Sequence, residues 1–303
     1  MREKKGESTV KVLNFGSLNY DYVYQVDHMA RAGETICSAG MERYFGGKGL
    51  NQSIALARAG VPVYHAGMIG EDGDAFLELC RENKVDTSYI RTVQGKSGHT
   101  IIQVDKSAQN CILLYGGTNR RITEEYIDTV LKDFEKGDIL LLQNEINLLD
   151  AIIDRAYEKG MTIILNPSPF DAALDICDLK KVSVFLINEV EGEQMTGERE
   201  PEGILSFMRR EYPEAQVVLT LGSAGSVWQY KEERCEQGII KVDAVDTTAA
   251  GDTFTGYFVA GMLEGKSVPD ILLQCAKASA ITVSRKGAAP SIPYKEELQR
   301  ELY

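Results

Sequence analysis

The sequence predicts an α/β fold, in which a doubly wound, mostly parallel sheet carries helices on both faces and a small β-sheet is added beside it. From Val10 onward, short β-rich runs alternate with longer amphipathic runs, which is the pattern of βαβ units. The strand-like runs of the second half are continuously apolar, as expected for strands covered on both faces. Two stretches, residues 19–45 and 98–115, break the alternation.

The alternation can be followed element by element. The first half predicts, in order, a strand, a helix, a strand and a helix over residues 10–16, 49–60, 61–70 and 74–83. The second half continues with helices over 123–137, 148–160, 202–212 and 253–265 and strands over 138–144, 161–168, 182–188 and 216–223. Residues 238–242 (GIIKV) read as one further strand.

The two interrupting stretches predict a small separate sheet. Residues 99–105 and 110–115 flank a polar turn and are typical of an antiparallel hairpin. A sheet formed by 19–45 and 98–115 would leave open edges and one bare face, so we expect it to close over a ligand as a lid or to pair with a second subunit. No linker separates independent parts, and residues 1–303 are expected to form one domain with this lid.

Composition narrows the possible functions. The chain has 303 residues, of which 44% are hydrophobic and 26% charged, which excludes a disordered or fibrous protein. Its formal charge of −12 makes nucleic acid and membrane surfaces unsuitable partners, and a polyphosphate would need a metal ion, a helix N-terminus and a few placed cations. The polar N-terminal segment and six scattered cysteines predict a cytoplasmic chain with reduced thiols. The isolated His28, His65 and His99 do not predict a zinc site.

Residues 245–254 (VDTTAAGDTF) are the most informative segment. Ala249, Ala250 and Gly251 have little bulk to shield their backbone N–H groups at the start of a predicted helix, where negative charge is stabilised. Asp252 could accept a proton from a hydroxyl while those N–H groups hold a phosphoryl group. Alternatively, Asp252 only interacts favourably with the helix dipole. The preceding small residues and a second acid, Asp246, favour catalysis.

A second segment, residues 45–52 (FGGKGLNQ), leads into the predicted helix 53–60. Its spacing does not fit the phosphate-binding GxxxxGK[ST] loop, because Lys48 is followed by Gly49. Glycines here would let the backbone approach a small polar ligand, to which Lys48 and Asn51 offer donors. The alternative is a simple glycine-rich turn between a strand and a helix.

Weaker signals surround these two segments. Asn19 and Asp21, at the end of the first strand, could bind sugar hydroxyls or form an Asx turn. Glu145 closes a buried strand, where ligands of open α/β sheets bind. Asn188 and Glu191 could organise hydrated Mg²⁺ or form a capping box. Residues 220–225 could cradle a nucleotide or form a plain hairpin.

These segments resemble the signatures of the PfkB family of ribokinase-like carbohydrate kinases. The first signature is matched by Gly46–Asn51 with its following helix, and the second by Asp246–Phe254, about 200 residues further on. The similarity extends through residues 284–293 and covers essentially the whole chain. Leu50 stands where alanine is more usual, and the hairpin 98–115 matches less closely than the rest.

The resemblance implies ATP-dependent phosphorylation of a sugar's primary hydroxyl, with Asp252 as the base and Ala249, Ala250 and Gly251 as the anion hole. The positions that match the family's sugar-binding residues are Asn19, Asp21, Gly47, Lys48, Asn51 and Glu145. Those that match its nucleotide and Mg²⁺ elements are Asn188, Glu191 (through water), Thr220, Gly222, Gly225 and Gly251. Those that match its site for an activating monovalent cation, usually K⁺, are Asp246, Thr248, Arg285, Gly287 and Ser291.

The expected reaction is therefore the conversion of D-ribose and ATP into D-ribose 5-phosphate and ADP, by a homodimer that associates through the small sheet. Another pentose, a ketohexose or a nucleoside is the alternative substrate. A catalytically silent sugar-binding protein on the same fold is the alternative of a different class. The intact Asp252 and its Ala-Ala-Gly turn argue against silence.

Overall fold

The computed structural model describes residues 10–107 and 109–299 and contains two sheets. The large sheet has nine strands in the order β13-β12-β11-β10-β9-β8-β1-β4-β5. Neighbouring strands from β11 to β5 run parallel, and β12 and β13 are antiparallel additions at one edge. Its strands are β1 (Val12–Phe15), β4 (Val63–Ile69), β5 (Asp86–Thr92), β8 (Ile139–Gln143), β9 (Thr162–Asn166), β10 (Val184–Asn188), β11 (Gln216–Thr220), β12 (Ser226–Tyr230) and β13 (Glu233–Gln237).

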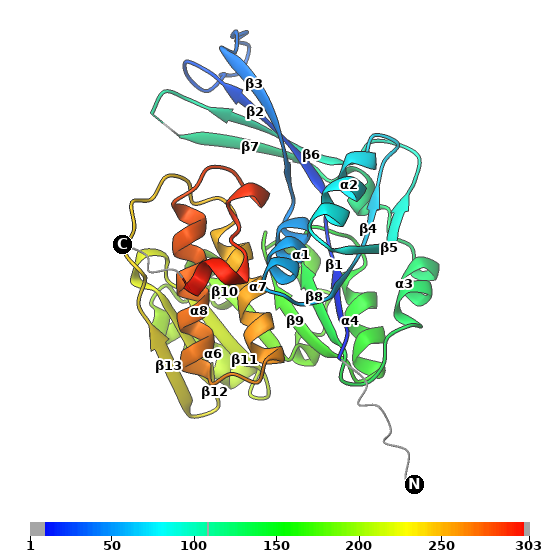
Figure 1. The fold of residues 1–303 in the computed structure, drawn as a ribbon, viewed down its shortest axis with the longest axis vertical. Coiled ribbons are helices and arrows are strands. Elements are labelled where there is room, and N and C mark those ends of the chain that lie inside the picture. Colours follow the sequence, from blue (N-terminus) through cyan, green and yellow to red (C-terminus); the bar gives the residue numbers. More distant parts are fainter. Residues whose placement is uncertain (1–9, 108, 300–303) are drawn as a thin grey trace.

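Helices cover both faces of this sheet, as expected for a doubly wound fold (Figure 1). The α-helices are α1 (Lys48–Arg58), α2 (Asp74–Glu82), α3 (Glu124–Leu131), α4 (Leu149–Glu158), α5 (Glu189–Thr196), α6 (Pro201–Glu211), α7 (Ala250–Leu263) and α8 (Val268–Val283). Short 3₁₀ turns are η1 (Gly117–Arg120), η2 (Ala172–Leu174), η3 (Leu179–Lys181), η4 (Gly222–Ala224), η5 (Ala289–Ser291) and η6 (Lys295–Gln299).

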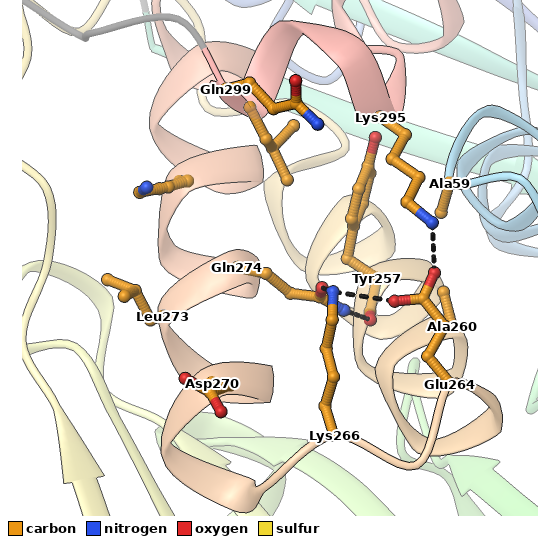
Figure 2. Close-up of a pocket in the computed structure, with 12 residues that line it drawn as sticks. Ala59, Tyr257, Ala260, Glu264, Lys266, Asp270, Leu273, Gln274, Lys295 and Gln299 are labelled. Atoms are coloured by element: carbon orange, nitrogen blue, oxygen red, sulfur yellow. Dashed lines mark hydrogen bonds and ion pairs between the residues drawn. The ribbon is translucent and has the colours of Figure 1, made fainter.

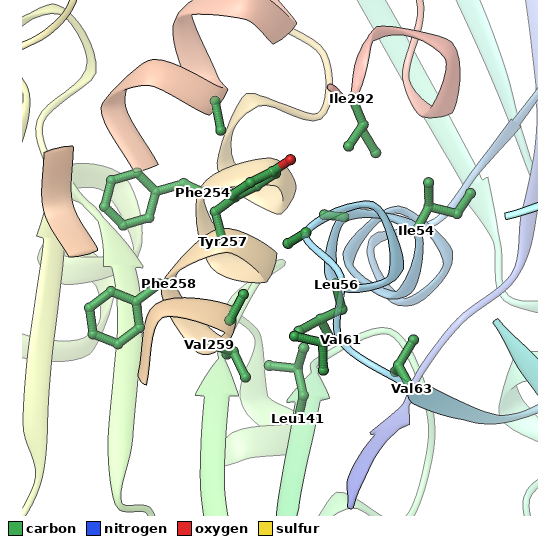
Figure 3. Close-up of a cluster of buried hydrophobic side chains, with 14 of the residues drawn as sticks. Ile54, Leu56, Val61, Val63, Leu141, Phe254, Tyr257, Phe258, Val259 and Ile292 are labelled. Atoms are coloured by element: carbon green, nitrogen blue, oxygen red, sulfur yellow. The ribbon is translucent and has the colours of Figure 1, made fainter. Parts of the chain in front are cut away.

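Two hydrophobic cores lie on opposite faces of the sheet. Successive strand residues alternate between them: Leu141 belongs to one core, and Leu140 and Leu142 to the other. The first core collects side chains of α1, α2, α7 and α8, and the second those of α3, α4 and α6. Figure 3 shows the first core, in which Tyr257 and Val259 of α7 lie opposite Leu56 of α1. The predicted cover on both faces is confirmed.

The predicted small sheet is confirmed and projects beyond the body of the molecule (Figure 1). It contains β2 (Asn19–Gln25), β3 (Gly40–Gly46), β6 (Gly98–Val104) and β7 (Asn110–Tyr115) in the order β3-β2-β6-β7. Strands β6 and β7 form the expected antiparallel hairpin, although Ala108 in its turn lies outside the described residues. Its action as a lid stays a prediction.

Two local predictions are wrong. Residues 238–242 form no strand: β13 ends at Gln237, and the apolar side chains of Ile239, Ile240 and Val242 line a cavity instead. Asn19 and Asp21 neither end the first strand nor form an Asx turn. After β1 ends at Phe15, Asn19 starts β2, which pairs with β3 and β6 in the small sheet.

Candidate active site

The site forms along the edge where the parallel strands end. Because the carboxyl ends of parallel strands meet at one edge, the residues at these ends of β8, β9, β10 and β11 gather there. They are Glu145, Asn166, Asn188 and Thr220. The last three line one cavity of about 230 Å³, together with the start of α7.

Helix α7 begins with the expected small residues. Ala249 has a left-handed backbone (φ 61°) and its carbonyl accepts the Thr253 N–H at 2.8 Å, which closes the first turn. The N–H groups of a first helical turn point outward along the helix axis and lack intrahelical acceptors. A side chain added at Gly251 would meet no atom within 4 Å, so the backbone there faces open space. This helix start can receive an anion.

Asp252 lies in that first turn and is only 7% exposed. Two amides from α1 hold its carboxylate: Asn51 Nδ2 donates to Oδ2 and Gln52 Nε2 donates to Oδ1, both at 2.9 Å. The two helices approach closely because Gly256 has no side chain, and a Cβ there would lie 2.4 Å from the Cβ of Ala55. The packing of α1 against α7 thus unites the two sequence signatures.

The start of α1 is shaped by backbone contacts. Gly47, its N-cap, has φ 93°, and a Cβ at Gly49 would lie 2.3 Å from the Ser17 backbone nitrogen. Glu145 accepts a hydrogen bond from the Lys48 N–H at 2.9 Å, and the Ser17 hydroxyl donates to the same carboxylate oxygen. The Glu145 carboxylate, two residues beyond the end of β8, therefore occupies the positive end of α1.

Charges in this region influence one another strongly. Burial alone would lower the pKa of the Lys48 amine, but the carboxylates of Asp252, Glu145 and Glu191 outweigh it and raise that pKa. Burial raises the pKa of Glu145, which Lys48 and the Ser17 hydroxyl only partly oppose. The partly buried Lys48 ammonium thus lies among several carboxylates, an arrangement often found at functional sites.

The small sheet contributes two polar side chains. Asp21 accepts a hydrogen bond from the Thr100 hydroxyl of β6 at 2.6 Å. Its pKa rises to about 6, because it is buried and because the charge of Glu145 adds to this effect, while the Thr100 bond partly opposes it. Asn19 Oδ1 accepts a bond of 2.7 Å from Asn119 of η1. Asp21 needs the bare backbone of Gly46, where a Cβ would overlap its carboxylate.

Asn188 and Glu191 form a capping box at the start of α5. The Glu191 N–H donates to Asn188 Oδ1 at 2.9 Å, and the Asn188 N–H donates to Glu191 Oε2 at 3.0 Å. The capping interpretation is therefore confirmed. Both residues also line the 230 Å³ cavity beside Asp252, so capping does not remove them from the site. Their metal role stays a prediction.

A second cavity of about 390 Å³ adjoins the first and shares Thr220, Ala250 and Gly251 with it. None of its described lining residues is charged, and the lining is mainly apolar. Thr220 to Gly225 form the turn of the β11–β12 hairpin, so that interpretation is confirmed, and Gly222 and Gly225 both line the cavity. Gly225 has φ 105°, and a Cβ there would lie 2.1 Å from the carbonyl oxygen of Gln237.

Asp246 joins two loops near the start of α7. Its Oδ1 accepts bonds from the Thr248 N–H and hydroxyl, and its Oδ2 accepts the Gly287 N–H at 2.9 Å. Burial alone would raise the pKa of Asp246, but these bonds lower it. The Arg285 side chain instead binds Glu297, and the Ser291 hydroxyl donates to the Ala288 carbonyl at 2.7 Å.

Another cavity, of about 310 Å³, lies apart from this site beside α7 and α8 (Figure 2). Lys266 and Lys295 both form ion pairs with Glu264, and Gln274 donates to the Tyr257 carbonyl at 2.6 Å. In Figure 2 the charged groups of Glu264, Lys266 and Lys295 are thus paired with one another. None of the candidate catalytic residues lines this cavity.

Residue patterns missed several side chains that complete the site. These are Ser17, Gln52, Thr100, Asn119, Asn166, Ile239, Ile240 and Val242. The signal that singled out Glu145, a polar side chain at the end of a buried strand, also applies to Asn166. Across the described ranges 10–107 and 109–299, no group of three His, Cys, Asp or Glu could hold a metal ion by itself. Within the same ranges, no helix is both long and apolar enough to span a bilayer.

Comparison with known proteins identifies the family of this chain. Residues 10–295 match the pfkB family carbohydrate kinase pattern. The chain is 35% identical over 295 residues to a ribokinase of Haemophilus influenzae, covering 93% of this chain and 95% of that relative. The chain belongs to the pfkB family of carbohydrate kinases, which are phosphotransferases with an alcohol group as acceptor.

Two solved structures have the same fold. The ribokinase of Cryptococcus neoformans var. grubii in complex with ADP has a TM-score of 0.85 and 32% identity, and the match covers 96% of this chain and 99% of that one. The ribokinase of Arabidopsis thaliana complexed with ribose and ATP has a TM-score of 0.84 and 29% identity, with 96% and 97% covered. The predicted fold class is thus confirmed.

Proposed function

We propose that this chain transfers the γ-phosphoryl group of ATP to the primary hydroxyl of D-ribose, giving D-ribose 5-phosphate and ADP. The observation that carries the proposal is the position of Asp252. This buried carboxylate lies in the first turn of α7, accepts a hydrogen bond from Asn51 of α1, and borders the cavity lined by Asn188 and Glu191. The similarity to a ribokinase complexed with ribose and ATP supports the choice of substrates.

In this mechanism Asp252 accepts the proton of the sugar hydroxyl as the hydroxyl oxygen attacks the γ-phosphorus. The bond between that phosphorus and the bridging oxygen breaks, and ADP leaves. The negative charge on the transferred phosphoryl group develops beside the N–H groups of Ala250 and Gly251, with Ala249 setting their turn. Phosphoryl transfer depends mostly on such positioning and charge stabilisation.

The sugar would bind between the small sheet and Asp252. Asn19, Asp21 and Glu145 offer acceptors, and Lys48 and Asn51 offer donors. Gly47, with φ 93°, turns the backbone between Asn19 and Lys48 and would contact the sugar through its own backbone. Asn51 Oδ1 is buried and has no hydrogen-bond partner among the described residues, which supports a sugar hydroxyl as its missing donor. We expect the small sheet to cover the sugar as a lid.

The nucleotide would occupy the two adjoining cavities. The apolar 390 Å³ cavity suits a purine ring between Ile239, Ile240 and the C-terminal half of α8, with Gly222, Gly225 and Thr220 along its edge. The phosphates would then extend along the 230 Å³ cavity to Gly251, past Asn188. A side chain at Gly225 would be excluded by the Gln237 carbonyl, and this supports a role for the bare turn in shaping the cavity.

Cations would supply the positive charge that this acidic site lacks. Glu191 is 5% exposed and borders the phosphate cavity, so it could hold Mg²⁺ through water, which suits an ion that keeps several waters. When bound, Mg²⁺ neutralises charge on the phosphates. For K⁺, we propose the loops that Asp246 ties to Gly287, with backbone oxygens near Thr248, Arg285 and Ser291 as ligands. Equal rates with Li⁺, Na⁺ and K⁺ would contradict the K⁺ site.

We also propose a cytoplasmic homodimer, associated through the small sheet. Strand β7 lies at its edge, and the side chains of Ile112, Leu113 and Tyr115 are more than half exposed, at 57%, 66% and 53%. A second copy of the chain would cover this edge. Light scattering should give a dimer mass for the wild type and a monomer mass for Leu113→Lys, and a monomeric wild type would contradict this assembly.

The reaction itself is tested by the initial rate of ADP formation with Mg-ATP and K⁺. D-Ribose should give a kcat/KM at least ~10-fold above those of 2-deoxyribose, arabinose, fructose and adenosine, because a site that binds a substrate hydroxyl rejects analogues lacking or misplacing it. A higher kcat/KM for another of these compounds would make that compound the substrate but leave the proposed role of Asp252 unchanged. No turnover with any of them would contradict the proposed function.

A further inference from the structure

Behind Asp252 lies a buried network of polar side chains that takes no part in the mechanism above. Gln52 Nε2 donates to Asp252 Oδ1 at 2.9 Å, and Gln52 Oε1 accepts a bond of 2.7 Å from Gln143 of β8. Gln143 Nε2 also donates to Asn14 Oδ1 at 2.9 Å. Gln52, Gln143 and Asn14 are all 0% exposed, and none of them lines a described cavity.

The network continues away from the site. Asn14 Nδ2 donates to the Gly49 carbonyl at 2.7 Å and to Ser53 Oγ at 2.8 Å, and Ser53 bonds the buried His65 at 2.8 Å. Burial lowers the pKa of His65 to about 4, so the ring is neutral near pH 7. Asp252 is therefore the only carboxylate among the described members of this chain of contacts.

Two backbone carbonyls fix which way each amide faces. A carbonyl can only accept, so the Gly49 carbonyl places Asn14 with Nδ2 toward α1 and Oδ1 toward Gln143. Gln143 must then donate to Asn14, and its same Nε2 donates to Gln52 Oε1. This orders the amides of Asn14, Gln143 and Gln52 in one direction.

The second carbonyl acts from the other side. Asn166 Nδ2 donates to the Leu186 carbonyl at 2.9 Å, which turns Asn166 Oδ1 toward Gln52 Nε2 at 3.1 Å. If the Gln52 amide were reversed, its oxygen would face two acceptors, Asn166 Oδ1 and Asp252 Oδ1. Both sides therefore require Gln52 to present its N–H groups to the carboxylate.

Such a network is costly as a purely structural device. Each buried amide gives up hydration, and apolar side chains of the same shape would pack without that cost. Gln143 Oε1 is buried without a hydrogen-bond partner among the described residues, so the network is not even fully satisfied. A fixed donor aimed at one carboxylate oxygen explains why polar groups lie here.

We propose that Gln52 is a positioning residue, which holds the Asp252 carboxylate in one rotamer through a donor direction set by the Gly49 and Leu186 carbonyls. This inference rests on the proposed role of Asp252 as the proton acceptor. Gln52 lines none of the described cavities, so its loss should change the catalytic step and the pH dependence of turnover more than substrate binding.

The test compares kcat, the two KM values and the pH dependence of kcat for Gln52→Leu. Removing the donor should lower kcat by about 10- to 100-fold, leave both KM values within about 3-fold, and move the acidic limb of the kcat profile up by about one pH unit. A matched control is Gln229→Leu on β12, whose buried amide donates to the Leu205 carbonyl and lines none of the described cavities. That control should keep the wild-type profile.

A second variant guards against misfolding. Gln52→Glu has the same shape but places a carboxylate beside Asp252, so its acidic limb should move further upward than that of Gln52→Leu. Gln143→Leu should give a smaller shift in the same direction, and the double variant Gln52→Leu/Gln143→Leu should match Gln52→Leu alone. The inference is overturned if folded Gln52→Glu keeps the acidic limb of the kcat profile at its wild-type pH. It is also overturned if kcat and both KM values change together while that limb does not move.

The outcomes separate this inference from the proposed function. If the wild-type chain phosphorylates no sugar, or if Asp252→Asn keeps full turnover, the proposed function fails and the inference fails with it. If the wild type is active and Asp252→Asn is not, unchanged profiles in both Gln52 variants refute only the positioning role.

Discussion

Asn51 Nδ2 donates a hydrogen bond of 2.9 Å to Asp252 Oδ2 and so joins α1 to α7, although the two residues lie 201 positions apart in the sequence. In the proposed function, the bond connects the glycine-rich helix start that would hold the sugar with the helix start that would receive the phosphoryl group. The other amide atom, Asn51 Oδ1, is buried without a partner among the described residues. In the proposed function, Asn51 would therefore bind Asp252 through Nδ2 and a sugar hydroxyl through Oδ1.

Asn51→Leu should thus impair both substrate binding and catalysis. Loss of the donor to a buried carboxylate and of the acceptor for a hydroxyl should together lower kcat/KM for D-ribose by about 100-fold, equivalent to about 3 kcal/mol. The KM for ATP should change little, because Asn51 does not line the two nucleotide cavities. Steady-state kinetics with each substrate varied in turn test this, and an unchanged KM for ribose would contradict it.

Asp21 should lower the free energy of unfolding at neutral pH, although it is proposed to bind the sugar. Its pKa is about 6 in the folded chain against an ordinary value of 3.8, so folding favours the protonated form. The resulting penalty in the free energy of unfolding is absent below the ordinary pKa of 3.8. It grows as the pH rises from there to about 6, and it is fully present above that pH. Asp21→Asn removes it and should raise the free energy of unfolding by about 1–3 kcal/mol at pH 8.

This gain should shrink toward zero as the pH falls to 4, and the KM of the variant for ribose should rise at least ~10-fold, since a charged acceptor is lost. Urea unfolding at several pH values measures the first effect, and sugar kinetics the second. A stability gain that is independent of pH would show that Asp21 is not the group responsible.

Gly256 should be intolerant of even one methyl group. In Gly256→Ala the new Cβ would overlap Ala55 and push α7 from α1, at a cost of about 1–3 kcal/mol in unfolding free energy and with a loss of kcat. Gly203→Ala on α6 is the control, because its Cβ meets mainly the flexible Glu198 side chain. That change should stabilise the helix by up to about 1 kcal/mol and leave kcat unchanged. Equal effects of the two changes would refute the close-packing argument.

The parts of the fold and of the candidate site that could be predicted are those set by local residue patterns. The sheet could be predicted because apolar strands such as 138–144 alternate with amphipathic helices. The position of Asp252 in the first turn of a helix could be predicted because small residues precede this acid at the start of an amphipathic run. Residues 238–242 were misassigned because an apolar, β-branched run suits a cavity wall as well as a strand. Local pattern cannot distinguish these two burial environments.

The remaining gaps concern contacts between distant segments. Nothing near Gln52 in the sequence shows that Gln143 and Asp252 lie on either side of its amide. For Asn188 and Glu191, capping and binding were posed as alternatives, yet one side chain can cap α5 and border a cavity together. Spacing alone could not reveal that the two roles are compatible.

The nucleotide assignment predicts a selective effect at Ala276. This residue of α8 lines the 390 Å³ apolar cavity, so Ala276→Phe should fill the space proposed for the purine and raise the KM for ATP at least ~10-fold. The KM for ribose should stay near the wild-type value. Leu273→Phe, on the same helix but lining the separate 310 Å³ cavity, serves as the control and should leave both values unchanged. A higher KM for ribose in Ala276→Phe would contradict the assignment.

The central claim, that Asp252 is the proton acceptor, is tested most directly by Asp252→Asn, which keeps the shape of the side chain and removes its basicity. The variant should bind ribose and ATP with dissociation constants within a few-fold of wild type by calorimetry, while kcat falls by about 10³-fold. Asp270→Asn, an exposed acid in the first turn of α8, is the matched control and should retain full turnover. Turnover near the wild-type rate in Asp252→Asn would contradict the account.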